Sequence, residues 1–365
     1  MTRIKDIIRE LEGVAPTSYQ ESYDNTGLIT GDQNAEVKEV LITLDVTEAV
    51  VQEAIRLSCN LIIAHHPIVF KGLKSLTGRN YVERTVISAI KNDIAIYAIH
   101  TNLDNVHTGV NKKICDRLAL KNTKILRPKT NTLSKLVTFV PKNDTQDVLD
   151  ALHQAGAGAI GNYDNCSFSV EGIGSFTPNI QADPTVGSPG SPEKVIENRV
   201  EVVFPSFKAK AIVQSLFQAH PYEEVAYYLQ MLENENQEVG SGMFGELNND
   251  MEAVDFLQYL KDKMELKCIR HTSLCKRKIR RVAVCGGSGS FLLSAAKSRS
   301  ADVFITADFK YHEFFDAEDS IIIADIGHYE SEQFTKDLLH EILTEKFDKF
   351  ALNLSEVETN PISYI

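Results

Sequence analysis

The sequence predicts an α/β protein whose core is built from two α/β halves, with an inserted α+β domain of β-α-β-β-α-β order. Apolar runs such as residues 60–64 and 321–324 do not alternate with polar residues, which is typical of parallel strands buried on both faces. These runs alternate with segments of helical length, which favours parallel sheets with right-handed crossovers. Between residues 126 and 239 a different order of strands and helices indicates a separate domain.

The first half, residues 1–125, starts with an amphipathic segment at about residues 2–12 that predicts a helix. A polar, turn-rich stretch follows, and then a strand that Asp45 closes and a helix that Thr47 can cap. The next elements continue a β-α-β-α-β order, which predicts helices on both faces of the sheet. They are expected at residues 60–66 (strand), 81–93 (helix), 94–100 (strand) and 110–120 (helix).

The middle block, residues 126–239, is expected to form the inserted domain. Its strands and helices follow the β-α-β-β-α-β order of a ferredoxin-like unit. A stretch rich in Pro, Gly and Ser lies between its two middle strands and predicts a long loop. The expected elements are a strand and helix in 135–158, one or two strands in 162–178, a strand at 196–205, a helix at 207–220 and a strand at 222–232.

The second half, residues 240–365, returns to the α/β pattern. A glycine-rich turn, GGSGS at residues 286–290, connects an apolar strand to a helix. The last buried strand leads into what the periodicity predicts to be one long helix, and the tail is expected to add an edge strand and a turn. The expected elements are a helix at 251–264, strand, turn and helix in 279–298, a strand in 301–319, strand and helix in 321–347, and the tail 352–365.

Composition is that of an ordinary globular protein, with 43% hydrophobic and 24% charged residues among 365. A chain of this length can bury a large core and is expected to form two or three domains. The formal net charge of −12 argues against non-specific binding to nucleic acid or to an anionic membrane. The basic stretch 267–281 is interpreted as a solvated loop and strand edge, with a nucleic-acid contact as the alternative.

The thiols and the apolar segments bear on where the protein works. The N-terminal segment lacks the apolar region of a signal peptide, and no stretch reaches the ~18 apolar residues of a membrane span. The cysteines form no C-x-x-C pair, so free thiols in a reducing cytosol are expected. We therefore expect a cytoplasmic protein without a membrane partner. The six cysteines are Cys59, Cys115, Cys166, Cys268, Cys275 and Cys285.

Two adjacent histidines, His65 and His66, follow the apolar run of residues 60–64. Successive side chains point to opposite faces of a strand. Both imidazoles therefore reach one cleft only if the strand ends there, which Pro67 favours. Taken alone, the pair is explained equally well by metal binding and by hydrogen bonds that cap the strand end.

Imidazole and carboxylate side chains also follow two other predicted strands. Asp104 lies four residues beyond the strand-end His100, and His328 and Glu332 share one helical face at a spacing of four. A His–Glu pair at this spacing is also common on solvated helices. Because ligands of open α/β sheets gather at the carboxyl ends of strands, we expect the three stretches to converge. The predicted metal ligands are His65, His66, Asp104, His328 and Glu332.

The mixture of donors indicates which ions to expect. Imidazole with carboxylate favours Zn²⁺, Mn²⁺ or Fe²⁺ over Ca²⁺ or Mg²⁺, which prefer oxygen alone. Five ligands that include two carboxylates able to bridge suit two divalent cations per subunit with a bridging water. We therefore predict a two-metal centre.

Other residues near predicted strand ends are weaker candidates. His100 and His312 are candidate proton shuttles, whereas His107 and Asp308 are expected to support the ligands, to move protons or simply to lie on the surface. The GGSGS turn can offer backbone N–H groups to a phosphate, but a tight strand-to-helix turn explains it equally well. The four remaining histidines are interpreted as structural or exposed. They are His153, His220, His271 and His340.

Several segments resemble those of the GTP cyclohydrolase 1 type 2 homologues, the Nif-three-like proteins. The resemblance covers residues 1–125 and 240–365 and implies a Nif-three-like core with a dinuclear metal site at the five predicted ligands. The matching segments are SYDNTGLITGD, LIIAHHPIVFKGLKSLTG, AIHTNLDNVHTGVN, VAVCGGSGS, ADVFITADFKYHEFFDA and ADIGHYESEQF.

The middle block is similar to the PII/CutA-like insertion of longer bacterial members, with PYEEVAYYL at residues 221–229 as its most recognisable piece. The resemblance implies a ring-shaped homohexamer with metal sites facing an internal cavity. It also implies that the partners are other copies of the chain and a small-molecule substrate of unknown identity.

The ligand set and the resemblance favour a metal-dependent hydrolase of a small, nucleotide-like substrate. A metal-bridging hydroxide would be the nucleophile, with His100 or His312 moving protons. The family's name refers to ring-opening of GTP, which is one such reaction. The alternative is a regulatory or adaptor protein with a structural or sensory metal site and an effector-binding insert, and a third hypothesis is metal storage or delivery.

Overall fold

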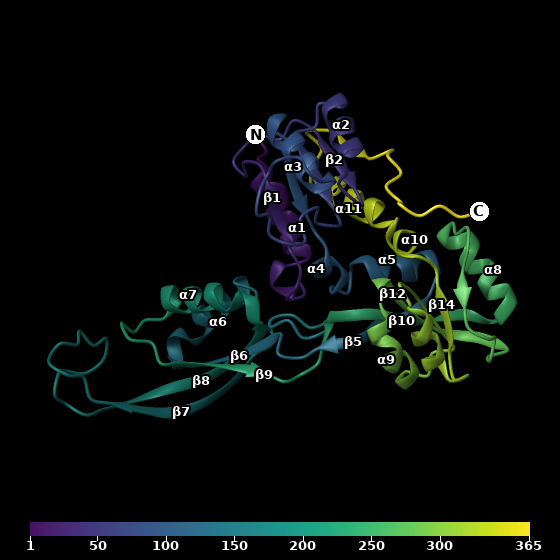
Figure 1. Ribbon diagram of the computed structural model, residues 1–365. Coiled ribbons are helices and arrows are strands. Elements are labelled where there is room, and N and C mark those ends of the chain that lie inside the picture. The colour runs from purple at the N-terminus through teal and green to yellow at the C-terminus, as the bar shows by residue number, and fades with distance from the viewer. The chain divides into compact units, whose positions relative to one another are not determined.

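The structure, a computed structural model, describes residues 1–365 and divides into two compact units (Figure 1). Unit 1 combines both ends of the chain, Met1–Pro128 and Gln237–Ile365, and unit 2 is the middle segment Lys129–Asn236. The boundaries expected from sequence, residues 126 and 239, lie close to these. Unit 1 contains two sheets and unit 2 contains one, so the protein is of the α/β class with an α+β middle segment.

The first sheet of unit 1 has the order β1-β4-β3-β2-β15, with parallel strands at its centre. Every residue of β2, β3 and β4 is buried, which confirms the interpretation of their unbroken apolar runs. The sequence did not predict β1, an antiparallel edge strand within the polar stretch that precedes β2. The bounds are Gly27–Thr30 (β1), Val40–Thr43 (β2), Leu61–Ala64 (β3), Ala95–Ala98 (β4) and Leu352–Leu354 (β15).

Helices cover both faces of this sheet, as predicted. Ile62 and Ile96 pack toward α2 and α3, while Ile42 and Ile63 belong to the larger core that includes α1. The Thr47 hydroxyl accepts a hydrogen bond from the N–H of Val50 (3.3 Å), which confirms the predicted N-cap. The helices of this half are Ile4–Val14 (α1), Glu48–Arg56 (α2), Tyr81–Lys91 (α3), Thr101–Asp104 (α4) and Val110–Arg117 (α5), with a 3-10 turn at Thr17–Tyr19.

The second sheet of unit 1 has the order β11-β14-β13-β12-β10-β5. Parallel strands β13 and β14 are again entirely buried, and the neighbouring parallel strand β12 is buried at its centre, residues 282–285. The sequence missed β5 and β10 because neither contains a continuous apolar run, and many residues of β5 are exposed. The bounds are Lys121–Lys129 (β5), Asn236–Glu252 (β10), Arg270–His271 (β11), Lys278–Ser288 (β12), Val303–Ala307 (β13) and Ile322–Asp325 (β14).

The helix predicted after the last buried strand is two helices, so that prediction was wrong. The chain turns at Gln333, whose side chain donates to the Met264 carbonyl (2.9 Å), and Phe334 is buried beneath the Arg117 guanidinium. The break leaves a one-turn helix, α10, that carries the candidate ligands. The helices of this half are Ala253–Met264 (α8), Leu293–Ser298 (α9), His328–Glu332 (α10) and Thr335–Thr344 (α11), with 3-10 turns at Ser290–Leu292 and Tyr311–Ala317.

Unit 2 is a four-stranded antiparallel sheet of order β7-β8-β6-β9 with two helices. Val200, Val202 and Phe204 of β8 pack against the helices, so the alternate residues of that strand face away from them. The elements are Leu133–Pro141 (β6), Thr145–Gln154 (α6), Phe168–Phe176 (β7), Glu193–Pro205 (β8), Ala209–Ala219 (α7) and Tyr227–Leu232 (β9), with 3-10 turns at Lys142–Asp144 and Ser206–Lys208.

The cysteines and the helix lengths can also be compared with what the sequence predicts. All six cysteines are free, and Cys59 and Cys285 are buried. None of the helices combines the length and the apolar character that crossing a membrane requires.

Candidate metal centre

The candidate ligands lie at the carboxyl ends of strands from both sheets of unit 1. β3 ends at Ala64, so His65 and His66 lie at the point where the strand stops. Asp104 ends the short helix α4 that follows β4, and α10 follows β14. The structure therefore brings together all five residues that the sequence singled out as ligands, although they come from three distant segments.

The five side chains form two overlapping groups that share Glu332. The groups are His66, His328 and Glu332, and His65, Asp104 and Glu332. Glu332 Oε2 lies 3.0 Å from His66 Nε2 and 3.2 Å from His328 Nε2. Its other oxygen, Oε1, lies 3.9 Å from His65 Nε2, which is 3.5 Å from Asp104 Oδ1. The two oxygens of one carboxylate thus face two separate donor sets, which is the arrangement of a bridging ligand.

Two atoms of the cluster are buried without a hydrogen-bond partner. They are His65 Nε2 and Asp104 Oδ1, and both are shielded from solvent. Polar atoms buried in this way are rare in folded proteins because desolvation costs about 1–3 kcal/mol each. A cation between them would satisfy both. The residues present therefore fit a metal ion, and their nitrogen-plus-carboxylate character fits Zn²⁺, Mn²⁺ or Fe²⁺.

The outer nitrogen of each ligand imidazole is held by the protein. His65 Nδ1 contacts the Ile99 carbonyl at 2.8 Å. His66 Nδ1 lies 2.8 Å from Asp45 Oδ1, and His328 Nδ1 lies 2.7 Å from Asp308 Oδ2. Each contact orients its ring so that Nε2 faces the cluster, as is common for metal-binding histidines.

Sequence reasoning found some of these supporting residues and missed others. Asp308 was a candidate for such a role, and the structure places it there. Asp45 was recognised only as the end of a strand, although its place at the same sheet edge as His66 was a usable signal. Asp24 lies in the polar stretch before β1 and was missed. Its carboxylate accepts from the Thr101 N–H (3.0 Å) and lies 2.8 Å from His100 Nδ1.

The two candidate proton shuttles lie in different environments. His100 forms a third group with His65 and His66 and lines the cavity at the cluster. His312 is exposed, and its ring contacts are with Tyr311 and Phe315. The structure does not bring His312 to the cluster, because its 3-10 turn presents the side chain to solvent. His107 is also outside all three groups.

The GGSGS turn contributes to the site in a way that the sequence did not predict. A Cβ on Gly287 would lie 2.5 Å from Glu332 Oε1, and its φ of +61° also favours glycine. Its N–H donates to the Ser331 hydroxyl (2.9 Å), and the Gly286 N–H donates to Asn111 Oδ1 (3.0 Å). These two amides are engaged within the protein and do not form a phosphate cradle. The glycines instead leave room for the shared carboxylate.

Burial and mutual contact shift the pKa values within the cluster. Burial opposes ionisation of Glu332, but the neighbouring imidazoles, with those of His328 and His66 within hydrogen-bond distance, outweigh burial and lower its pKa. Burial, reinforced by the charge of Glu332, raises the pKa of Asp104. For His66, burial is outweighed by Asp45 and Glu332, which raise its pKa to about 9. Burial of His328 is likewise outweighed by Asp308 and Glu332, which raise its pKa to about 11.

Metal binding is therefore expected to release protons. At pH 7 the metal-free protein holds protons on His66 and His328, and a metal ligand must be deprotonated. We expect these two protons, and a further contribution from Asp104 because its pKa is raised, to leave each chain, so the affinity should rise with pH until the ligands lose their protons unaided. Calorimetric titration with Zn²⁺ or Mn²⁺ in two buffers of different ionisation enthalpy measures this number. Equal heats in both buffers would contradict the assignment of these histidines as ligands.

A cavity of about 470 Å³ opens beside the cluster. The metal-facing residues form part of its wall, and the aromatic side chains of Tyr23, Phe70 and Phe291 form another part. Residues 360–362 of the tail also line it, whereas no lysine or arginine does. This volume is in the range typical of small-molecule sites.

The chain is similar to known proteins over nearly its whole length. The family model described as Duf34/NIF3 (NGG1p interacting factor 3) matches residues 2–361. A Bacillus subtilis protein named GTP cyclohydrolase 1 type 2 homolog is 40% identical over 99% of this chain and 98% of its own length. A protein of the same name from Halalkalibacterium halodurans is 38% identical over 98% of each chain. A solved Bacillus cereus structure, described as a protein related to NIF3, has a TM-score of 0.87 at 37% identity, covering 100% of this chain and 99% of its own.

Proposed function

This chain belongs to the DUF34/NIF3 family, and on that premise we propose that it is a metal-dependent hydrolase of a small, nucleotide-like substrate. Two divalent ions, Zn²⁺, Mn²⁺ or Fe²⁺, would be held by His65, His66, Asp104, His328 and Glu332. The observation that carries the proposal is the position of Glu332, whose two oxygens face different donor sets beside an open cavity.

The chain's own residues have distinct tasks in such a reaction. When bound, a pair of divalent ions supplies Lewis acidity and lowers the pKa of water. Asp24 holds Nδ1 of His100, which leaves the other ring nitrogen free to exchange a proton beside the cluster. Asp45 and Asp308 keep the rings of His66 and His328 in place, so the donor atoms need no rearrangement during turnover.

The cavity wall supports a substrate with a flat ring. Tyr23 and Phe70 are largely exposed at this wall, where aromatic side chains can stack on a heterocycle. Without a lysine or arginine in the wall, a phosphate group would be met chiefly by the ions themselves. GTP is included among the substrates to test because relatives carry the name GTP cyclohydrolase 1 type 2 homolog.

Turnover by the metal-loaded protein tests the proposal. We expect activity toward at least one member of a panel of nucleotides, including GTP, and phosphoesters. His100→Gln should keep its metal and lower kcat by about 10²-fold, the usual contribution of a general acid or base. The matched control is His107→Gln, because His107 follows the same strand but lies outside the cluster. Absence of turnover with every substrate and metal, or equal kcat in wild type and His100→Gln, would overturn the proposal.

A regulatory or adaptor role is the second candidate function. It is favoured by the separateness of unit 2, which supplies none of the residues of the cluster or of its cavity. In this role the metal would be structural or sensory, and an effector would bind to unit 2. A protein of this kind would bind metal but show no turnover with the panel.

We also propose that the protein works in the cytoplasm as a homohexamer. The six free cysteines are consistent with a reducing compartment. The hexamer follows from the family resemblance, and the mass of the assembly in solution tests it.

A further inference from the structure

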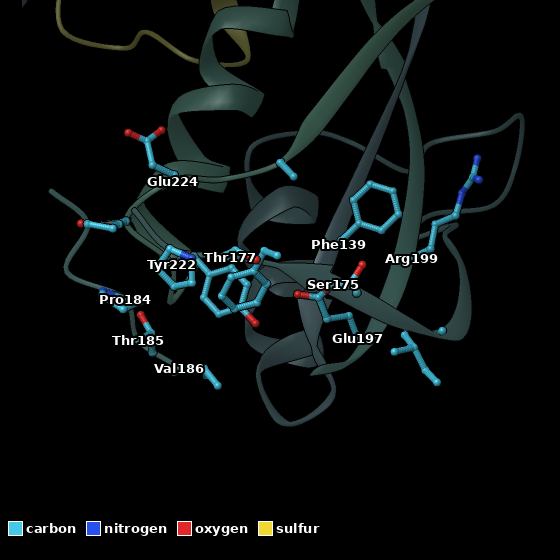
Figure 2. A pocket seen from close by; sticks show the side chains of 18 of the residues that line it. Phe139, Ser175, Thr177, Pro184, Thr185, Val186, Glu197, Arg199, Tyr222 and Glu224 are labelled. Atoms are coloured by element: carbon cyan, nitrogen blue, oxygen red, sulfur yellow. The ribbon is translucent and has the colours of Figure 1, made fainter. Parts of the chain in front are cut away.

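Unit 2 contains a second cavity, unrelated to the metal centre, with a volume of about 670 Å³. It lies on the face of the sheet that α6 and α7 leave uncovered, because Glu197 and Arg199 of β8 alternate with the residues that pack against those helices. Figure 2 shows Phe139, Ser175, Glu197 and Tyr222 grouped around the hollow, whereas Arg199 and Glu224 extend away from it.

Two glycines of β7 create the hollow. Gly172 pairs directly with Glu197 across the strands, and a Cβ there would meet a single atom, the Glu197 carbonyl oxygen, at 4.0 Å. A Cβ on Gly174 would lie 2.0 Å from Glu197 Oε2, so this glycine leaves room for the carboxylate itself. Any larger residue at position 174 would displace Glu197.

A loop, residues 177–186, forms the opposite wall and is tied to the segment before β9. The Asp183 N–H donates to Glu223 Oε1 (2.9 Å), and the Thr185 hydroxyl donates to the Pro221 carbonyl (3.0 Å). Thr177, Pro184 and other loop residues line the cavity. The wall is therefore built by specific contacts, as expected for a preformed ligand site.

Glu197 is a buried carboxylate without a cationic partner. It is only 8% exposed and forms no ion pair. The nearby cations form ion pairs with other carboxylates. Arg199 pairs with Glu201 at 2.7 Å, and Lys142 pairs with Glu171 at 2.8 Å. A buried carboxylate is costly unless a cation or hydrogen-bond donors accompany it.

The neighbouring histidine cannot supply that charge. His220 Nε2 contacts the Phe139 carbonyl (2.9 Å), and its Nδ1 accepts from the Tyr222 N–H (3.1 Å). Both ring nitrogens are thus used, and burial lowers the pKa of His220, which keeps the ring neutral. The buried Tyr222 hydroxyl lies against the Glu197 carboxylate and has no other partner, and burial together with this contact raises the pKa of Tyr222 to about 12.

The remainder of the wall is mostly apolar and carries a negative excess. Phe139, Phe176 and Tyr222 supply aromatic surface, with the rings of Phe176 and Tyr222 6.4 Å apart. The charged residues in the wall are Glu171, Glu197, Glu223, Glu224 and Arg199. A ligand that matches both properties has an apolar body and a positive charge.

We propose that this cavity binds a small organic cation, a primary amine on an aromatic or aliphatic body. The ammonium group donates to the Glu197 carboxylate and to the Tyr222 oxygen, and the body packs against Phe139 and Phe176. Charge-assisted hydrogen bonds of this kind are about twice as strong as neutral ones. The site is independent of the metal centre and of the hydrolase proposal.

Titration of the full-length, metal-free protein with phenethylamine tests the proposal, with phenethyl alcohol as the neutral probe of the same shape. Ligand-observed NMR is expected to show phenethylamine bound about tenfold more tightly than the alcohol. Glu197→Gln should remove this preference, and Gly172→Leu should abolish binding of both probes because it fills the hollow. The matched control is Glu224→Gln, since Glu224 is an exposed carboxylate at the same cavity.

Three results would overturn the proposal. The first is equal affinity for the amine and the alcohol, and the second is an amine preference that persists in Glu197→Gln. The third combines two observations: the wild type binds no amine, and Gly172→Leu changes the mass of the oligomer. Together they would show that a second copy of the chain covers this face. Backbone amide spectra of each variant show whether unit 2 remains folded, so lost binding is separated from lost structure.

Discussion

Glu332→Gln is expected to empty both metal positions at once. One oxygen of Glu332 faces His66 and His328, and the other faces His65 and Asp104. An amide offers one neutral oxygen in place of two charged ones, so each ion loses a ligand and the pair loses its bridge. The affinity should fall by more than the ~10–100-fold typical of losing an outer hydrogen-bond partner. Metal content per chain after dialysis, measured by elemental analysis, is expected to drop from two toward zero.

Glu330→Gln is the matched control for this substitution. Glu330 is a buried carboxylate on the same short helix, but it accepts from Asn360 (3.0 Å) and belongs to none of the metal groups. It should keep two ions. By contrast, Asp104→Asn should lose the ion at His65 and keep the other, because Asp104 belongs to one group only. If Glu332→Gln still bound two ions, Glu332 would not bridge them. The hydrolase proposal, which depends on that bridge, would then also be wrong.

Phe204→Ala and Phe304→Ala form a second pair with large expected effects. Both rings are fully buried, Phe204 in the core of unit 2 and Phe304 on β13 of unit 1. Removing a buried phenylalanine ring costs about 3–5 kcal/mol through lost burial and the cavity left behind. Denaturant titration of each variant measures the loss in free energy of unfolding.

The two variants should differ in their effect on the metal content of the protein. Phe304→Ala weakens the strand beside β14, which leads into α10, so metal content should fall with stability. Phe204→Ala should destabilise unit 2 and leave two ions bound, because unit 2 has its own core. Metal loss in Phe204→Ala would show that the two units unfold together.

The same pair separates the two candidate functions. If the protein is a hydrolase whose chemistry resides in unit 1, Phe204→Ala should keep its turnover. If the insert carries a regulatory function, effector binding should disappear while metal content stays unchanged. Measuring turnover and metal content on the same sample distinguishes these outcomes.

Much of the candidate site was predictable because it follows a local rule. His65, His66 and Asp104 follow apolar strands, and parallel strands bring their carboxyl ends to one edge. The same rule applied to Asp45, whose partner His66 lies one strand away, but no pattern within its own segment indicates that contact. Asp24 was beyond prediction, since it lies in an irregular stretch and reaches His100 across 76 residues of sequence.

The elements that sequence missed share a physical feature. β1, β5 and β10 lack the unbroken apolar run of a central strand, so their pairing depends on neighbours that are distant in the chain. The break between α10 and α11 likewise depends on tertiary contacts, namely those of Gln333 with Met264 and of Phe334 with Arg117. The helical periodicity of the sequence continues through Gln333 and Phe334, so the pattern alone predicts a single helix.

By itself, the sequence determined which strands are buried, where each of them stops and which imidazole and carboxylate side chains follow. Hydrophobic pattern and chain direction are local properties, so they can be read along the chain. Only the tertiary structure decided that Glu332, rather than Asp104, is shared between the two donor sets, that His100 joins them and that His312 does not. Those outcomes depend on how two sheets from opposite ends of the chain pack together, and on a few ångströms of side-chain position that no local pattern encodes.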